Sequence, residues 1–184
     1  MRRQVEGMFI DLSALAKGYG VDRATLKLRD LGIRSAMLEV GGEIRVIGGR
    51  GSRAWSLGIE TPDGGAQDVQ DVVPLRDGAL ATSGDYRQVI LHEGKLRSHT
   101  IDPRTGRPVE HGLASVSVVA DTCMRADALA TGLMVLGDDV GHRLAEDKGW
   151  AAMFISRNDD GSFRERTTEA WNRRLAAEAS ADAD

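Results

Sequence analysis

Asp127 and Thr131 form the clearest pair of side chains in this sequence that could hold a metal ion. They stand four residues apart in the stretch "ADALATG", so on a helix both point to the same face. A carboxylate and a hydroxyl are hard oxygen ligands of the kind that Mg²⁺ prefers, with water or phosphate oxygens in its other positions. A solvated aspartate beside a threonine at the core edge is the simpler interpretation of the spacing. The alanine and leucine neighbours favour burial, however, and a buried carboxylate without a partner is costly.

His99 is the candidate for proton transfer. It stands at the end of a predicted hairpin strand, beside the turn "DPRTG", and histidine exchanges protons near neutral pH. A strand histidine that is exposed or hydrogen-bonded is the alternative. The other histidines, His92, His111 and His142, have no chemical context of their own. The sequence holds neither an HExxH motif nor a Cys/His cluster, which argues against a zinc site.

The stretch "DLSALAKGYG" raises a different question. Lys17 lies six residues after Asp11, near the start of a predicted helix, where free amides and the helix dipole favour an anion such as phosphate. Gly18 and Gly20 follow, although a glycine inside a helix costs roughly 1 kcal/mol relative to alanine. A helix whose backbone must admit a ligand explains both glycines. A surface lysine is the alternative interpretation of Lys17.

The elements that must position these residues are mostly strands. We expect a helix over residues 13–30, capped by Asp11 or Ser13 and ended at Gly32. Two further helices are expected in "TCMRADALATGLMVLG" and "DDVGHRLAEDKG". The glycine pair in "LEVGGEIRVIG" predicts a bulge or sharp turn between two strands, and "RQVILH" with "KLRSHTI" predicts a hairpin. Because strands follow one another directly, the expected fold class is α+β, a mostly antiparallel sheet with about three helices.

Composition narrows the class of protein. The 184 residues suit one domain, and 41% hydrophobic with 28% charged residues is typical of a globular protein. A net charge of −4 offers no basic field for nucleic acid, and the single cysteine, Cys123, excludes an intrachain disulfide. No apolar run reaches the length of a membrane span, and the N-terminus does not read as a signal peptide. We expect a core over residues 1–170 and a disordered acidic tail over residues 171–184.

Four stretches, taken in order, resemble the ApbE family of flavin transferases, the FAD:protein FMN transferases. They are "DLSALAKGYGVDRA", "LEVGGEIRVIG" with "WSLGIETP", "ALATSGDYRQ" through "SHTIDPRTGRPV", and "ADALATGLMVLG". The resemblance covers about residues 9–155. Its most specific part is H-x-I-D-P-x-T-G followed by A-D-A-L-A-T.

The resemblance implies an ApbE-like fold and a Mg²⁺-dependent enzyme. Such an enzyme cleaves the pyrophosphate of FAD, moves FMN onto a Thr or Ser hydroxyl of a target flavoprotein and releases AMP. The implied acceptors are subunits of membrane redox complexes, such as the Na⁺-translocating NADH:quinone reductase (Nqr) and Rnf-type complexes. The implied location is the periplasm or the outer face of the inner membrane.

The resemblance also implies roles for individual residues. Asp127 and Thr131 match side-chain metal ligands, and Ala14 matches a position whose backbone carbonyl binds the metal. His99 matches the histidine at the reaction centre. The glycines after Lys17 would then allow close approach of FAD. Positions that match FAD contacts are Asp11, Lys17, Gly41, Gly42, Glu43, His99, Thr100 and Ile101.

Two alternatives stay open at this point. If water replaces the acceptor hydroxyl, the same site is an FAD pyrophosphatase that yields FMN and AMP. Members of the family normally carry a substantial N-terminal portion before the motif at residue 11, and we expect that portion to be missing here. The chain would then be a truncated flavin-binding remnant without activity, and these residues alone would bind FAD weakly.

Overall fold

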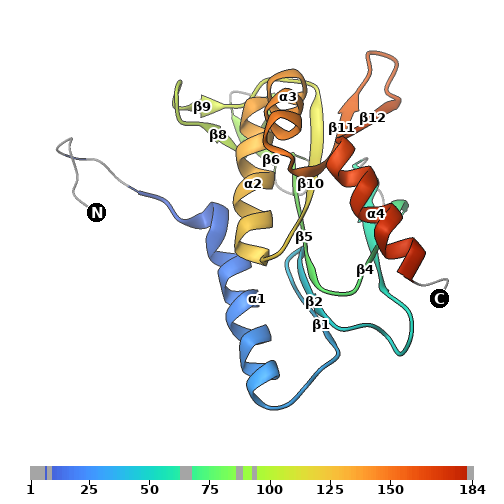
Figure 1. Cartoon of the computed structure of the whole chain (residues 1–184). Helices are drawn as coiled ribbons and strands as arrows, with labels where there is room; N and C mark the ends of the chain where they lie inside the picture. Colours follow the sequence, from blue (N-terminus) through green and yellow to red (C-terminus); the bar gives the residue numbers. More distant parts are fainter. Residues whose placement is uncertain (1–6, 8–9, 63–67, 86–88, 93–94, 182–184) are drawn as a thin grey trace.

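A computed structural model describes residues 7, 10–62, 68–85, 89–92 and 95–181. Within these residues the chain forms four helices and twelve strands (Figure 1). The helices are α1 (Ser13–Asp30), α2 (Cys123–Leu136), α3 (Asp138–Lys148) and α4 (Glu169–Ala181). The strands are β1 (Ala36–Val40), β2 (Glu43–Ile47), β3 (Trp55–Glu60), β4 (Val69–Leu75), β5 (Gly78–Gly84), β6 (Val89–His92), β7 (Lys95–Ser98), β8 (Ile101–Asp102), β9 (Arg107–Pro108), β10 (Leu113–Ala120), β11 (Ala151–Arg157) and β12 (Phe163–Thr167).

One six-stranded sheet organises the molecule, with the strand order β1-β2-β5-β10-β11-β12. Every neighbouring pair in it is antiparallel. Three further two-stranded pairs form: β3 with β4, β6 with β7, and β8 with β9. The predicted α+β class with a mostly antiparallel sheet is confirmed, and so is the hairpin of β6 and β7, whose turn at residues 93–94 lies outside the described residues.

The sheet is covered on both faces. Side chains of successive residues in a strand point to opposite faces, so Phe154 of β11 packs on one side and Met153 on the other. The first face carries α1, α2 and α3, and the second carries the β3–β4 hairpin and α4 (Figure 1). This double cover explains why β10, "LASVSVVA", is buried along almost its whole length.

Helix α1 has the bounds that the sequence predicts. Oδ1 of Asp11 accepts a hydrogen bond of 2.8 Å from the backbone N–H of Ser13, which satisfies one free amide of the first turn. The chain leaves the helix through Gly32, whose φ of 83° lies in the left-handed region that favours glycine. The N-cap residue is Leu12, which makes no side-chain cap, so the expected cap at Asp11 or Ser13 is wrong, whereas the expected end at Gly32 is confirmed.

The glycine pair between β1 and β2 is a tight turn. Gly41 and Gly42 have φ values of 62° and 95°, and Val40 pairs with Glu43 across them. Two-residue hairpin loops with positive φ at both positions match the twist of the strands, and such loops favour glycine. The turn places Glu43 at the first position of β2.

The expected disordered tail is wrong for most of its length. Residues 169–181 form α4, which brings the helices to four rather than about three. Trp171 is 1% exposed and Leu175 packs against the same apolar cluster, so one stripe of the helix is buried. On its outer face Arg173 lies 2.7 Å from Glu169. The charged residues suggested a solvated segment, but packing of this stripe stabilises the helix.

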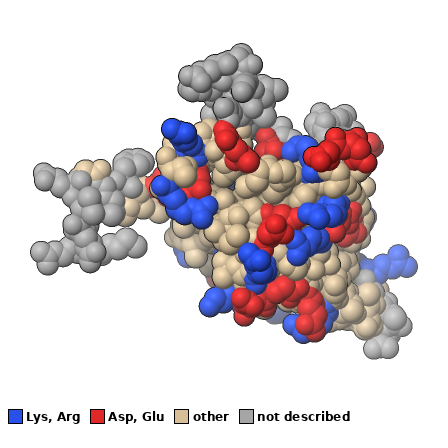
Figure 2. Space-filling view, turned by 90° about the horizontal axis from the view of Figure 1, so that it is seen from above, with Lys and Arg blue, Asp and Glu red and all other residues tan. Residues whose placement is uncertain are grey.

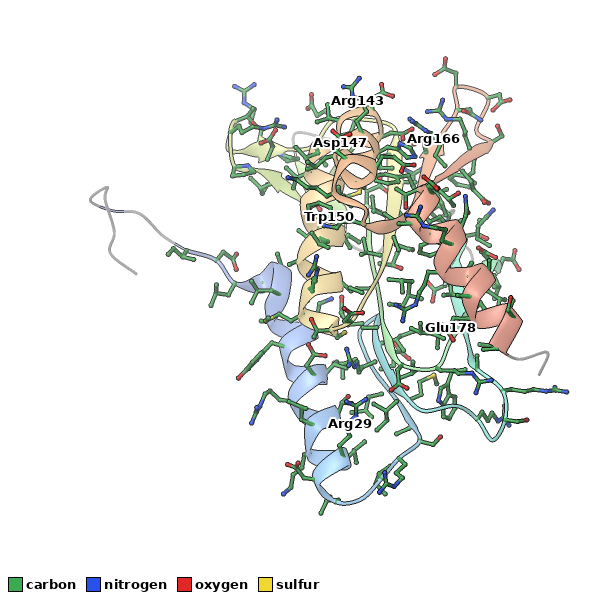
Figure 3. The ribbon with its side chains drawn as sticks, viewed as in Figure 1. Arg29, Arg143, Asp147, Trp150, Arg166 and Glu178 are labelled. Carbon is green, nitrogen blue, oxygen red and sulfur yellow. The ribbon has the colours of Figure 1, made fainter. Side chains whose placement is uncertain are left out.

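The surface mixes charges of both signs, as the face in Figure 2 shows. None of the helices in the described part of the chain is long and apolar enough to span a membrane.

Candidate active site

An ion pair between α1 and the β1–β2 hairpin lies at the centre of the candidate site. Nζ of Lys17 is 2.7 Å from Oε1 of Glu43. The Lys17 side chain is half exposed, whereas the Glu43 side chain is 3% exposed. Gly41 lies beside the pair, because a Cβ there would be 3.7 Å from Oε2 of Glu43 and 4.0 Å from the lysine Nζ. The structure thus brings three predicted cofactor-binding residues together.

Glu43 is held in an unusual environment for a carboxylate. Burial raises its pKa, the hydrogen bond from Lys17 opposes that shift, and the charge of Asp127 adds to it. Its second oxygen, Oε2, is buried without a hydrogen-bond partner in the described structure. A buried acceptor of this kind is costly, so this oxygen is available to a donor from a ligand.

Asp127 reaches the same place from α2. Asp127 is 4% exposed, and its Oδ2 accepts a hydrogen bond of 3.0 Å from the backbone N–H of Gly18. Burial raises the pKa of Asp127, while the Gly18 bond and the charge of Lys17 oppose the increase. The burial expected for Asp127 is confirmed. Two buried carboxylates therefore lie near a single ammonium group, an arrangement that favours a further cation.

The backbone N–H of Gly18 relates the carbonyl of Ala14 to the carboxylate of Asp127. In an α-helix the N–H of Gly18 points toward the carbonyl of Ala14, four residues earlier. That amide is also 3.0 Å from Oδ2 of Asp127. With a helical N–O distance of about 2.9 Å, the two oxygens are separated by at most about 6 Å. The Ala14 carbonyl and the Asp127 carboxylate therefore lie in the same region of the molecule.

Thr131 lies one turn further along α2 and is half-buried. Its Oγ1 is 3.1 Å from the hydroxyl of Ser83 on β5. Because Thr131 and Asp127 share a face of α2, the carboxylate and hydroxyl meet the sheet on the same side. Ser83 was not singled out by the sequence analysis, and only its place opposite Thr131 in the fold identifies it.

The oxygen donors fit Mg²⁺. A carboxylate, a hydroxyl and a backbone carbonyl are hard ligands, and this ion keeps several positions for water or substrate phosphate. Across the residues that the structure describes, no group of three or more His, Cys, Asp or Glu side chains could hold a metal. The hard oxygen ligands themselves suit a cation whose remaining positions are filled by water or phosphate.

Gly18 has a different role from the one expected. A Cβ at this position would lie 2.4 Å from the carbonyl oxygen of Cys123, so the glycine lets α1 and α2 approach one another. The interpretation that it admits a ligand to the backbone is not supported by this contact. A Cβ at Gly20 would meet nothing within 4 Å. The structure gives no packing reason for glycine there.

Asp11 is exposed at the entrance to α1. Hydrogen bonds from the hydroxyl and the backbone N–H of Ser13 lower the pKa of its carboxyl. It remains ionised in this position, and its described contacts are those of a residue that fixes the start of the helix.

The segment with His99, Thr100 and Ile101 belongs to another part of the fold. His99 follows the last residue of β7 and is exposed, and Ile101 begins β8. The Thr100 carbonyl accepts a 3.0 Å bond from Val109, and nearby Nε2 of His111 lies 2.8 Å from the carbonyl of Met134. Residues 109–111, which pair with this segment through Val109, thus lie near the C-terminal end of α2, whereas Asp127 lies in its first half.

Comparisons with known proteins identify the family of this chain. A model of the ApbE family matches residues 1–154. The FAD:protein FMN transferase of Vibrio cholerae is 41% identical over 172 residues, and the matched region covers 93% of this chain and 51% of the relative. The FAD:protein FMN transferase of Haemophilus influenzae is 42% identical, and the matched region covers 90% of this chain and 48% of the relative.

Solved structures give the same result. The apo flavinyl transferase ApbE of Pseudomonas stutzeri has a TM-score of 0.78 and 39% identity, and the match covers 90% of this chain and 51% of that one. The ApbE protein of Thermotoga maritima has a TM-score of 0.80 and 31% identity, with 92% and 54% covered. This chain thus spans about half the length of its relatives. The family match over most of its residues, with the shared fold, shows that the chain belongs to the ApbE family.

Proposed function

We propose that this chain carries the metal and pyrophosphate part of an FAD:protein FMN transferase. The reaction is the Mg²⁺-dependent transfer of FMN from FAD to a Thr or Ser hydroxyl of a flavoprotein, with release of AMP. The observation that carries the proposal is the convergence of α1, the β1–β2 turn and α2 on one place. There Lys17 lies 2.7 Å from Glu43, and Gly18 lies 3.0 Å from Asp127.

Each of these residues has a role that its chemistry supports. Lys17, half exposed at the first turns of α1, binds the pyrophosphate of FAD together with the positive end of the helix dipole. Gly41, Gly42 and Glu43 line the cofactor site, and Oε2 of Glu43 accepts a hydrogen bond from the cofactor. Asp11 contacts FAD from the start of α1.

Asp127, Thr131 and the carbonyl of Ala14 would hold Mg²⁺. A cation held by these residues would supply positive charge to neutralise the charge that develops on the pyrophosphate during displacement. The buried Asp127 carboxylate keeps its orientation because Gly18 donates to it. Glu43 holds Lys17 in place, so that the ammonium and the metal ligands face the same ligand group.

His99 is proposed as the general base, with Thr100 and Ile101 beside the cofactor. It accepts the proton of the acceptor hydroxyl as the hydroxyl oxygen forms a bond to the phosphorus on the FMN side. The bond from that phosphorus to the bridging oxygen breaks, and AMP leaves with that oxygen. Because His99 is exposed on the β7–β8 connection, an acceptor from solvent can reach it.

The acceptor belongs to the same proposal. It is a flavoprotein subunit of a membrane redox complex, Nqr- or Rnf-like, that presents a Thr or Ser in an exposed segment. The proposed location is the periplasm or the outer face of the inner membrane. The support is the family membership and the site residues that this chain shares with the family pattern.

The test is AMP release from FAD with and without Mg²⁺, with an acceptor domain present. We expect Mg²⁺-dependent AMP release that Asp127→Ala abolishes and Thr131→Ala weakens. Asp139→Ala is the matched control, because Asp139 is an exposed aspartate on α3 and should leave the rate unchanged. Near-wild-type release by Asp127→Ala would contradict the metal assignment.

The same experiment separates the two alternatives. Mass spectrometry of the acceptor should show FMN on one hydroxyl residue. Free FMN with AMP and an unmodified acceptor would instead indicate an FAD pyrophosphatase. Bound flavin without AMP release would indicate a flavin-binding remnant.

A further inference from the structure

Asp22 caps α2 although it belongs to α1. Its Oδ1 accepts a hydrogen bond from the backbone N–H of Cys123, and its Oδ2 accepts one from Met124, both of 2.9 Å. The first amides of a helix have no partner within the helix, and a carboxylate near them also interacts favourably with the dipole. The amides of Cys123 and Met124 therefore have this partner only when α1 lies in this position.

Two contacts, one helical turn apart, join the helices. Gly18 and Asp22 are four residues apart on α1, and Cys123 and Asp127 are four residues apart on α2. Gly18 meets Asp127 at 3.0 Å, and Asp22 meets Cys123 at 2.9 Å. Because residues at i and i+4 share a face, this pair of contacts fixes the rotation of α2 about its axis. That rotation decides where the Asp127 carboxylate points.

Arg45 of β2 anchors the same junction to the sheet. Its guanidinium lies 3.7 Å from Oδ1 of Asp22 and donates a hydrogen bond to the carbonyl of Asp121, which precedes the α2 cap. The Asp22 and Arg45 side chains are largely buried, at 16% and 13% exposed. Asp22 thus has a fixed orientation.

We propose that Asp22 is a positioning residue for the metal site. By holding the first amides of α2 it sets the Asp127 carboxylate against the Gly18 amide and near the Ala14 carbonyl. The proposal rests on the proposed role of Asp127 as a metal ligand. If Asp22 only stabilised the start of α2, removing it should have the same effect as removing a capping residue that belongs to the α2 segment. This comparison separates a positioning role from a purely stabilising one.

The matched control is Thr122, the N-cap of the same helix. Its hydroxyl accepts a 3.3 Å bond from the Arg125 amide, a contact that lies within the α2 segment. Thr122→Ala therefore weakens the start of α2 without removing a link to α1. Asp22→Ala removes that link, and Asp22→Asn keeps one acceptor oxygen.

The first measurement is hydrogen exchange of the Gly18 amide by NMR in the full chain without metal. We expect exchange to be faster by about 10-fold or more in Asp22→Ala, because the bond to Asp127 is lost, and unchanged in Thr122→Ala. An unchanged Gly18 amide in Asp22→Ala would overturn the proposal, as would an equal effect of Thr122→Ala.

The second measurement is binding of Mn²⁺, the probe for the Mg²⁺ site, by the loss of its free EPR signal. Asp22→Ala should weaken binding by about 10-fold, as is typical when a residue that orients a ligand is removed, with a smaller loss in Asp22→Asn and none in Thr122→Ala. Equal binding by Asp22→Ala and the wild type would overturn the proposal.

Two other results are possible: Asp22→Ala does not fold, or the wild-type chain binds no Mn²⁺. If Asp22→Ala gives no cooperative urea transition, Asp22→Asn takes its place, and wild-type values for both readouts in that variant overturn the proposal. A wild-type chain that binds no Mn²⁺ would overturn the metal site of the proposed function, and with it the metal half of this inference. The Gly18 exchange result would still decide whether Asp22 positions Asp127.

Discussion

The ammonium group of Lys17 lies 2.7 Å from a carboxylate oxygen of Glu43 that is almost completely removed from solvent. The two residues come from α1 and from the first position of β2, so this contact joins a helix to the sheet. Lys17 can turn toward solvent, but Glu43 cannot. The pair is therefore asymmetric: loss of Lys17 leaves a buried charge unpaired, which is the costly case.

The burial of Glu43 predicts how the free energy of unfolding depends on pH. Burial raises the pKa of Glu43 above its ordinary value of 4.5. Between the unfolded and folded pKa values the folded chain binds more protons than the unfolded chain. The free energy of unfolding therefore falls as pH rises through that interval. Glu43→Gln should flatten this part of the profile, measured by urea unfolding from about pH 4 to pH 7.

Glu39→Gln is the control for that experiment, because Glu39 lies on the same hairpin and is exposed. It should keep the wild-type slope. A Glu43→Gln profile parallel to that of the wild type would show that Glu43 does not titrate differently in the folded state.

Gly18 and Gly20 should respond in opposite directions to alanine. Gly18→Ala would place a methyl group 2.4 Å from the Cys123 carbonyl, so α1 and α2 must separate, at a cost of about 1–3 kcal/mol or more. Gly20→Ala meets nothing within 4 Å and should stabilise the helix by roughly 0.5–1 kcal/mol. Urea unfolding of both variants checks this, and a neutral Gly18→Ala would refute the close approach.

Cys123 should be unreactive in the folded protein. The pKa of its thiol is raised to about 12. Burial is the largest cause, and the charges of Asp22, Glu43 and Asp127 add to it. Since the thiolate is the nucleophile, a thiol reagent at about pH 8 should label Cys123 only as fast as the chain unfolds. The labelling rate should rise with urea, and rapid labelling without denaturant would show that α2 opens locally.

His99→Ala should slow flavin transfer by roughly 10²- to 10⁴-fold and leave FAD affinity unchanged, as expected for a general base. Transfer to an acceptor domain and FAD binding by fluorescence measure the two quantities separately. Loss of FAD binding in this variant would identify His99 as a binding residue, and the base would lie elsewhere.

Trp171→Ala should destabilise the chain by about 3–5 kcal/mol, because a fully buried indole is replaced by a cavity between α4 and the sheet. Arg173→Ala, on the exposed face of the same helix, should change stability by less than about 0.5 kcal/mol. A small effect of Trp171→Ala on the urea midpoint would show that α4 contributes little to the fold.

The sequence predicted the parts of this fold whose signals are local. The end of α1 follows from Gly32, the turn of β1 and β2 from its glycine pair, and the burial of Asp127 from its apolar neighbours. Each of these signals acts over a few residues, where period and turn chemistry decide the backbone.

The parts that sequence could not predict depend on distant segments. The need for glycine at position 18 comes from Cys123, and the role of Asp22 comes from the start of α2. Helix α4 was missed because its polar and acidic residues suggested a disordered tail, whereas contact with the sheet stabilises it. His99 was a candidate from its position beside the turn "DPRTG", but its neighbours along the chain do not distinguish it from an ordinary strand residue, and its role came from the family resemblance.

The two bonds between α1 and α2 have a consequence for folding. They join residues 109 and 101 positions apart, and the chain between them includes β1, β2, β5 and β10 of the sheet. Closing so long a loop costs conformational entropy, which the rest of the fold must offset. A ligand held at this junction would therefore bind only the completed fold. Its binding energy would add to the stability of the whole chain, and ligand-induced thermal stabilisation would report folding and site assembly as one event.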